Sequence, residues 1–115
     1  MRFTTMTVAA VLIAPIAVQA EDKNGAAAYF TGVRLFESCK TDSVVCTTYV
    51  MAVTDAIAVL EFVNPSPSIC IPPHVSVRQV ILSFQSFVEK HPIMLNNPAA
   101  DLIREGLHDM FPCKN

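Results

Sequence analysis

The sequence predicts an all-α fold, a small disulfide-linked bundle of about four helices. Four segments carry apolar residues at spacings of three and four, which is the period of an amphipathic helix. No segment sustains the alternation at period two that a half-buried strand requires. The chain has only three glycines, and its prolines fall mainly between the candidate helices. Four cysteines complete the pattern.

The N-terminal residues have the features of a cleaved signal peptide. Arg2 precedes an apolar run over 8–18, and Val18-Gln19-Ala20 places small residues where a signal peptidase cleaves. A membrane anchor is the alternative, but a span needs about 20 apolar residues and this run is shorter. We therefore expect residues 1–20 to be removed on export and residues 21–115 to form a single domain.

The net charge of the predicted mature chain limits the classes of partner that it can bind. Loss of Arg2 leaves 7 of the 8 basic residues against 10 acidic ones, a net charge of −3. No basic run is present, which argues against a nucleic acid or an anionic membrane as the partner. The mature chain is also unusually apolar for its size, so we expect a homodimer that buries part of this surface.

The first two helices are predicted over residues 31–39 and 42–62. Thr31 and Asp42 are suitable N-cap residues, because a side-chain oxygen at that position accepts a hydrogen bond from an unpaired amide of the first turn. The apolar positions of the second helix are Cys46, Val50, Val53, Ile57 and Leu60.

The opposite side of the second helix is also largely apolar. It carries Thr48, Met51, Ala52, Asp55, Val59 and Phe62. Such a helix is usually enclosed, so we expect it at the centre of a bundle or of a dimer. A membrane span is the alternative, but Asp55 near its middle costs about 2.5–3.5 kcal/mol on insertion scales. We expect Asp55 to be buried, where it accepts hydrogen bonds or pairs with an arginine rather than acting in catalysis.

The third helix begins at Ser76, which forms a capping box with Gln79, and it ends before Pro92. Its apolar stripe consists of Val77, Val80, Ile81, Phe84, Phe87 and Val88. The fourth helix begins at Asn97-Pro98, a cap followed by proline at the first helical position. Its apolar residues are Leu102, Ile103, Leu107, Met110 and Phe111.

The cysteines are predicted to pair as Cys39 with Cys46 and Cys70 with Cys113. Each pair flanks two consecutive helices, and an antiparallel arrangement of those helices brings its members within disulfide reach. Zinc is the alternative, but an even cysteine count in an exported chain is typical of disulfides. Two prolines after Cys70 stiffen the chain between the disulfide and the third helix.

No catalytic constellation is evident. The candidate residues are His74, His91, His108, Asp101, Glu105 and Asp109. The histidines have no nucleophile at a recognised spacing, and the acidic residues share one helix face that is more typical of solvated surface than of a cation site. We therefore expect no enzymatic activity, no metal and no cofactor, and a protein that acts by contact.

Three apolar residues, Ile93, Met94 and Leu95, lie in a short segment between two prolines. One interpretation is that they close the end of the bundle core. The other is a stiff apolar loop that enters a groove of a partner.

A pattern of residues extends over positions 31–113. It comprises Cys39, Cys46, Tyr49, Asp55-Ala56, Cys70-Ile71-Pro72, Val75-Ser76, Gln79, His91-Pro92 and Phe111-Pro112-Cys113. This pattern resembles the Rap/Tai family, the resistance-associated or type VI amidase immunity proteins. Its most specific parts are Cys-Ile-Pro before a helix and Phe-Pro-Cys at the end.

The resemblance implies a dimeric all-α protein of the periplasm. Its partner would be a peptidoglycan amidase, a cysteine hydrolase delivered by type VI secretion, whose active-site groove the immunity protein covers. We expect the contact surface to combine the exposed side of the third helix with the segment that follows it: Arg78, Gln85, Glu89, Ile93, Met94 and Asn96. The alternative is a small periplasmic helical chaperone or stress protein without a dedicated effector.

Overall fold

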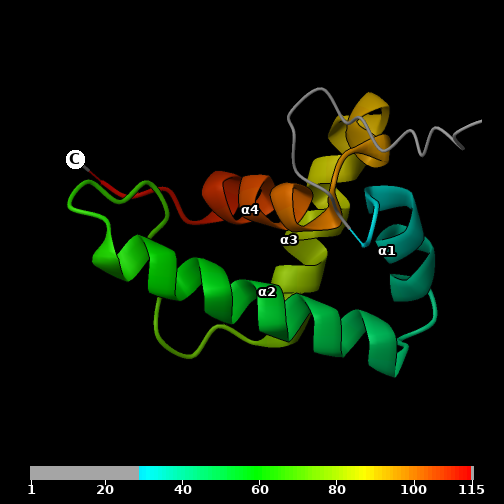
Figure 1. Ribbon diagram of the computed structural model, residues 1–115, viewed down its shortest axis with the longest axis horizontal. Coiled ribbons are helices and arrows are strands. Elements are labelled where there is room, and N and C mark those ends of the chain that lie inside the picture. Colours follow the sequence, from blue (N-terminus) through cyan, green and yellow to red (C-terminus); the bar gives the residue numbers. More distant parts are fainter. Residues whose placement is uncertain (1–28, 115) are drawn as a thin grey trace, which may run out of the picture.

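The computed structural model describes residues 29–114, which form four α-helices and one short 3-10 helix (Figure 1). The elements are α1 (Gly32–Cys39), α2 (Val44–Val63), α3 (Val77–Lys90), η1 (Pro92–Asn96) and α4 (Ala99–Met110). The all-α prediction is confirmed. The predicted signal peptide and its cleavage site lie outside the described residues.

Side-chain caps set the start of α1 and α3 where the sequence predicts them. Thr31 Oγ1 accepts a hydrogen bond from the Arg34 amide at 3.3 Å. In the capping box of α3, Ser76 Oγ accepts from the Gln79 amide at 3.2 Å, and Gln79 Oε1 accepts from the Ser76 amide at 2.9 Å. Each bond satisfies an amide that has no partner within the first turn.

Two predicted caps are wrong. Asp42 lies in the turn before α2 with a positive φ of 48°, so Ser43 is the N-cap of that helix. The N-cap of α4 is Pro98, which makes no side-chain cap bond. Asn97 instead ends the 3-10 segment, and its carbonyl accepts a hydrogen bond from the Gly32 amide at 2.8 Å. That contact ties the start of α1 to the residues before α4.

The core is built around the crossing of α3 and α4. In Figure 1, α3 passes behind α4 and crosses its direction instead of lying antiparallel along it. The largest fully buried side chains are Phe84, Leu35, Leu102, Ile103, Leu107, Val50 and Val88. Gly106 of α4 lies directly against the backbone of Ser83 in α3. A glycine at this point lets the two helix backbones approach closely.

The helix α2 lies along one side of the molecule and not at the centre of the bundle, so that part of the prediction is wrong, while a position at the centre of a dimer stays a prediction. Only Cys46, Val50 and Ile57 of its residues are buried. The apolar stripes of the other helices bury one another, and among residues 29–114 nothing covers the outer side of α2. A long apolar face therefore stays exposed.

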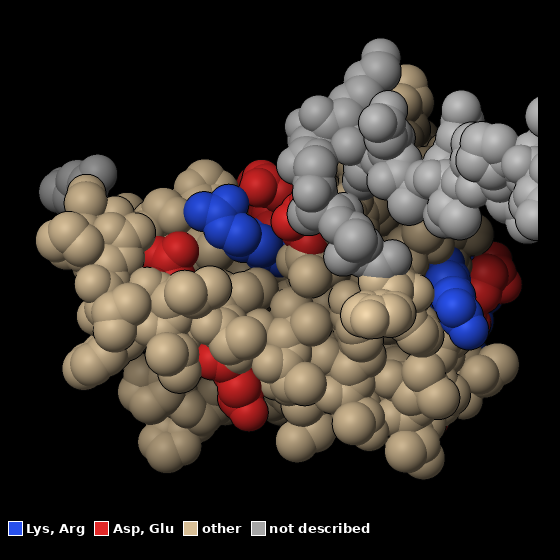
Figure 2. Space-filling view, in the orientation of Figure 1, with Lys and Arg blue, Asp and Glu red and all other residues tan. Residues whose placement is uncertain are grey.

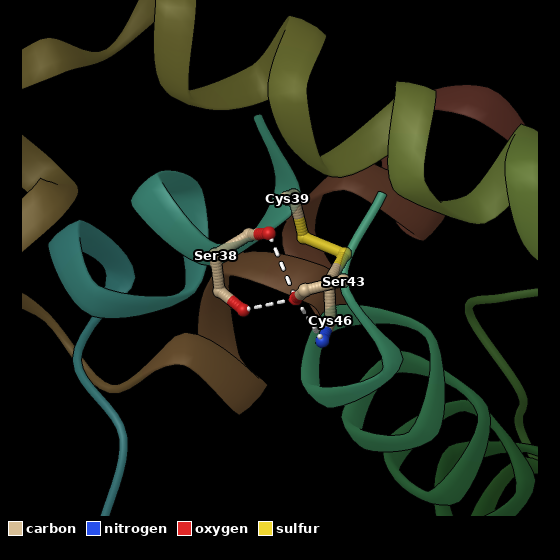
Figure 3. Close-up of a disulfide and its surroundings, with 4 residues drawn as sticks. All are labelled: Ser38, Cys39, Ser43 and Cys46. Carbon is tan, nitrogen blue, oxygen red and sulfur yellow. Dashed lines mark hydrogen bonds between the residues drawn. A yellow bond between two sulfur atoms is a disulfide. The ribbon is translucent and has the colours of Figure 1, made fainter. Parts of the chain in front are cut away.

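The turn between α1 and α2 is fixed by a disulfide and by two serines (Figure 3). The sulfur atoms of Cys39 and Cys46 are bonded, and their Cα atoms lie 5.0 Å apart. Ser43 Oγ donates to the Ser38 carbonyl at 2.9 Å and accepts from the Cys46 amide at 3.1 Å. The hydroxyls of Ser38 and Ser43 also lie 2.7 Å apart.

The second disulfide joins Cys70 to Cys113, as predicted, but for a different structural reason. Residues 68–70 run beside residues 111–113 in a short antiparallel bridge between Ile69 and Pro112. The Cys70 amide donates to the Phe111 carbonyl at 2.8 Å, and the Cys113 amide donates to the Ser68 carbonyl at 3.2 Å. Backbone pairing therefore aligns these cysteines.

Candidate interaction surfaces

The described residues offer contact surfaces rather than a chemical centre. Residues 29–114 contain no cluster of three or more histidine, cysteine, aspartate or glutamate side chains that could hold a metal ion. All four cysteines are in disulfides. The ion pairs among these residues, Lys40 with Glu37 and Arg104 with Glu105, both lie at the surface. Exposed ion pairs of this kind contribute little to stability.

The exposed side of α3 forms a continuous stripe. Its members are Arg78, Leu82, Gln85 and Glu89, which recur at steps of three and four and so share one face; Gln85 is half-buried and the other three are exposed. Near the start of α3 the stripe borders a hollow of about 160 Å³ that also touches the turn between α1 and α2. Three of the six predicted contact residues therefore lie together on one helix.

The 3-10 helix η1 continues the chain directly from α3 and is held by backbone hydrogen bonds. The Met94 amide donates to the His91 carbonyl at 2.9 Å, and the Asn97 amide donates to the Met94 carbonyl at 2.8 Å. Gly32 of α1 lies so close that a Cβ atom there would be 2.7 Å from the Leu95 carbonyl oxygen. This segment is thus packed against α1 and has a defined shape.

Two interpretations were possible for Ile93, Met94 and Leu95: that they close the end of the core, or that they project toward a partner. Each is correct for part of the segment. Met94 and Leu95 are half-buried and pack against the core, so they close the end of the bundle. Ile93 is 92% exposed and projects from η1. Asn96 is also exposed. Of the predicted contact residues in this segment, Met94 is the one that turns inward.

The exposed face of α2 is an extensive apolar surface that sequence reasoning expected to be covered. In Figure 2, the surface on the side of α2 consists mostly of uncharged residues. The exposed large apolar residues of this helix are Val44, Val45, Met51, Val59, Leu60, Phe62 and Val63. The signal for such a face was already in the sequence, because apolar residues occur on every side of the helix. Exposed apolar surfaces of this extent mark interaction sites.

Asp55 lies on this exposed face, so the expectation that it is buried is wrong. It takes part in none of the ion pairs formed by residues 29–114. It borders a hollow of about 190 Å³ with Met51, Val75 and Val77, which are apolar. By length and composition alone α2 is long and apolar enough to cross a membrane, the one such helix in the described part of the chain. A carboxylate in the middle of this face is costly in a bilayer.

Comparison with known families agrees with a contact function. Residues 31–113 match the family model of the Rap1a immunity proteins. No curated protein and no solved structure matches the chain significantly. The family resemblance inferred from the sequence is confirmed, and the matched range contains both disulfides and every helix described above. The chain therefore belongs to the Rap1a immunity protein family and is a type VI effector immunity protein, not an enzyme.

Proposed function

We propose that this protein resides in the periplasm and neutralises a type VI secreted peptidoglycan amidase by covering its active-site groove. The contact surface is the α3 stripe together with Ile93 of η1. Both disulfides fit an oxidising compartment. The observation that carries the proposal is the exposure of Ile93 on a segment that is otherwise firmly anchored.

An anchored apolar side chain is suited to binding because little conformational freedom is lost on association. The backbone of η1 is hydrogen-bonded within itself and packed against α1, while Met94 and Leu95 hold it to the core. Binding energy that is not used to order a loop remains available for affinity. A side chain that fills a well-packed pocket from which water is excluded can carry much of the binding energy of an interface.

The shape of the surface also fits a hydrolase groove. Enzyme sites are concave and largely apolar, with a few polar groups that fix orientation. Ile93 supplies a projecting apolar group, and the stripe on α3, the helix that leads into η1, supplies polar and charged groups. Arg78 and Glu89 carry opposite charges near the two ends of this stripe. Charges placed in this way govern orientation and association rate more than affinity.

Binding to amidases encoded in the same genome tests the proposal. Each candidate amidase, with its nucleophilic cysteine replaced, is mixed with the immunity protein and followed by size-exclusion chromatography with light scattering. The active enzyme is assayed on peptidoglycan in parallel. We expect a stable complex with one of these enzymes and loss of hydrolysis on addition of the immunity protein.

A matched pair of variants locates the contact. Ile93→Asp should weaken binding roughly tenfold or more, because it places a charge in an apolar site. Val44→Asp introduces the same charge at a position of α2 that is also largely exposed, and its affinity should match that of the wild type. Unchanged hydrolysis by every candidate amidase would refute the proposed function. Equal binding by both variants would refute the proposed surface.

A further inference from the structure

We propose that the Cys70–Cys113 disulfide is a thiol–disulfide exchange site, which a dithiol opens and which closes again while the rest of the domain stays folded. The Cys39–Cys46 disulfide is protected and takes no part in this reaction. The proposal is independent of the contact with the effector, because it is read out from the oxidation state of the cysteines and not from binding.

The two disulfides differ in their access to solvent. Cys39 and Cys46 belong to the core and are 5% and 1% exposed. Cys70 is exposed, and Cys113 is half-buried. A thiolate must reach a sulfur atom before it can exchange with the disulfide, so access limits the rate. Exchange at the buried disulfide therefore requires local unfolding of α1 or α2, whereas the exposed disulfide can react in the folded protein.

Cys70 also lines a hollow of about 490 Å³ between the end of α2 and the chain that leads to α3. This hollow gives an attacking thiol space beside the disulfide. Its one carboxylate, that of Glu61, accepts hydrogen bonds through Oε2 from the amides of Ser68 at 2.8 Å and Ile69 at 3.2 Å. These two donors offset part of the negative charge that an incoming thiolate meets. The other lining residues are mostly apolar: Ala58, Phe62, Pro67, Ile69, Ile71 and Pro72.

The exchange consists of two displacements at sulfur. A thiolate of the dithiol attacks Cys70 Sγ, the bond to Cys113 Sγ breaks, and Cys113 leaves as a thiolate that takes a proton from water. The second thiolate of the dithiol then attacks the sulfur that joins the dithiol to Cys70 and releases Cys70. Two electrons thus pass to the protein, and the dithiol becomes a disulfide. Lys114 follows Cys113 directly, and a neighbouring cation favours the thiolate form of the leaving cysteine.

Backbone contacts hold the two cysteines together after their bond opens. The Cys70 amide donates to the Phe111 carbonyl at 2.8 Å, and the Cys113 amide donates to the Ser68 carbonyl at 3.2 Å. Ile69, next to Cys70, is 3% exposed and packs in the core. None of these contacts involves a sulfur atom. We therefore expect the two thiols to stay close to each other and to form the disulfide again when an oxidant replaces the dithiol.

Loop closure and access act on different quantities. The sequence separation of 43 residues makes Cys70–Cys113 the more stabilising of the two disulfides, which limits the extent of its reduction at equilibrium. The rate of opening in an excess of dithiol depends instead on access to the sulfur atoms. The disulfide that contributes more to stability is therefore also the one that opens first.

Reduction of the native protein tests the proposal. The oxidised protein is incubated with an excess of dithiothreitol, samples are quenched with acid at intervals, and free thiols are alkylated and identified by peptide mass spectrometry. We expect Cys70 and Cys113 to be labelled at least about tenfold faster than Cys39 and Cys46. In guanidinium chloride the two pairs should react at similar rates. Labelling of all four cysteines together in the native protein, or earlier labelling of Cys39 and Cys46, would overturn the proposal.

Two double variants provide matched controls. With Cys39→Ser and Cys46→Ser combined, the remaining disulfide should open at the fast rate of the wild type. With Cys70→Ser and Cys113→Ser combined, the remaining disulfide should keep the slow rate. A fast rate in this second variant would mean that the domain unfolds once the exposed disulfide is open, contrary to the proposal. If either variant fails to fold, the labelling kinetics of the wild type decide.

Three further measurements define the reaction. Glutathione, a monothiol, should give a mixed disulfide that acid traps on Cys70, and a mixed disulfide mainly on Cys113 would refute Cys70 as the attacked residue. Oxidised glutathione, added after dithiothreitol is removed, should restore the Cys70–Cys113 bond, and failure to restore it would refute a reversible site. A purified protein with a Cys-x-x-Cys dithiol then replaces dithiothreitol. Faster exchange at equal dithiol concentration identifies a protein as the dithiol, and slower exchange identifies a small thiol.

Discussion

Glu61, near the end of α2, accepts a hydrogen bond from the backbone amide of Ser68 at 2.8 Å. The same oxygen accepts from the next amide, that of Ile69, at 3.2 Å. This one side chain therefore holds the start of the segment that pairs with the C-terminal residues and carries Cys70. The contact couples the end of α2 to the second disulfide.

The ionisation of Glu61 should contribute to the pH dependence of stability. Hydrogen bonds from the amides of Ile69 and Ser68 lower the pKa of this carboxyl, and the positive charges of Arg104 and His108 lower it further. A carboxyl whose pKa is depressed by folding contributes stability above its unfolded pKa of about 4.3, and this contribution is lost as the pH falls through the folded pKa. Urea unfolding at pH 7 and pH 3 should therefore show a smaller pH-dependent loss of stability for Glu61→Gln than for the wild type.

A surface glutamate provides the control for this experiment. Glu37 pairs with Lys40 at 2.7 Å, and both side chains are largely exposed. Because such pairs contribute little, Glu37→Gln should follow the wild type at both pH values. If Glu61→Gln and the wild type lose the same stability between pH 7 and pH 3, Glu61 does not contribute in the way proposed.

The crossing of α3 and α4 should not tolerate a side chain at Gly106. A Cβ atom there would lie 2.8 Å from the Ser83 carbonyl oxygen and 3.1 Å from the Phe84 amide nitrogen, both of them backbone atoms. Alanine normally stabilises a helix by about 0.8–1.0 kcal/mol relative to glycine. Here we expect Gly106→Ala to destabilise the protein by about 1–3 kcal/mol, because the helices must move apart. Urea unfolding measures this, and a more stable variant would contradict the close approach.

The two disulfides should differ in their contribution to stability. They close sequence separations of 7 residues for Cys39–Cys46 and 43 residues for Cys70–Cys113. Chain entropy then assigns about 2.4 kcal/mol to the first and about 4.0 kcal/mol to the second. Replacing both cysteines of each pair with serine, followed by thermal and urea unfolding, should give the larger loss for the Cys70–Cys113 pair. The reverse order would show that packing around the buried first disulfide outweighs loop closure.

Substitutions at the two neighbouring apolar residues of η1, Ile93 and Met94, should differ in their effect on the free energy of unfolding. Ile93 contacts little of its own chain, so Ile93→Ala should change the free energy of unfolding by less than about 0.5 kcal/mol. Met94 packs against the core, and Met94→Ala should cost about 1–2 kcal/mol, less than for a fully buried methionine. Urea unfolding of both variants gives the comparison. Equal losses would mean that Ile93 is also packed in solution.

Local signals in the sequence were sufficient for the helices, and the cysteine pairing was predicted correctly although the antiparallel arrangement assumed for α3 and α4 is wrong. The capping box at Ser76 and the cap at Thr31 act within one helical turn, so no tertiary contact is needed to predict them. The choice between Asp42 and Ser43 as a cap was not decidable in this way, because both are suitable residues. In the structure Asp42 lies at positive φ within the turn that the first disulfide closes, and Ser43 is the cap.

The contact surface was only partly predictable from the sequence. The spacing of apolar residues and the composition of a helix do not show which of its faces is covered by neighbouring elements. The stripe from Arg78 to Glu89 follows from the helical period, and the structure places it on one exposed face. The inward turn of Met94 and the outward projection of Ile93 depend on how η1 packs against α1. The sequence of α2 carries apolar residues on every side, but which of these sides stays exposed depends on how the other helices pack against it.

The sequence by itself determined four helices, the pairs of cysteines and the membership of an immunity family, because these depend on short-range periodicity and on residues at fixed spacing. Only the tertiary structure decided that α3 and α4 cross at Gly106, that Cys70 reaches Cys113 through a backbone bridge, and that Asp55 and Phe62 face outward. The physical reason is that burial is a property of the whole packing arrangement. In residues 29–114, α2 has neighbours on one side only, so the apolar residues on its other side remain available for a partner.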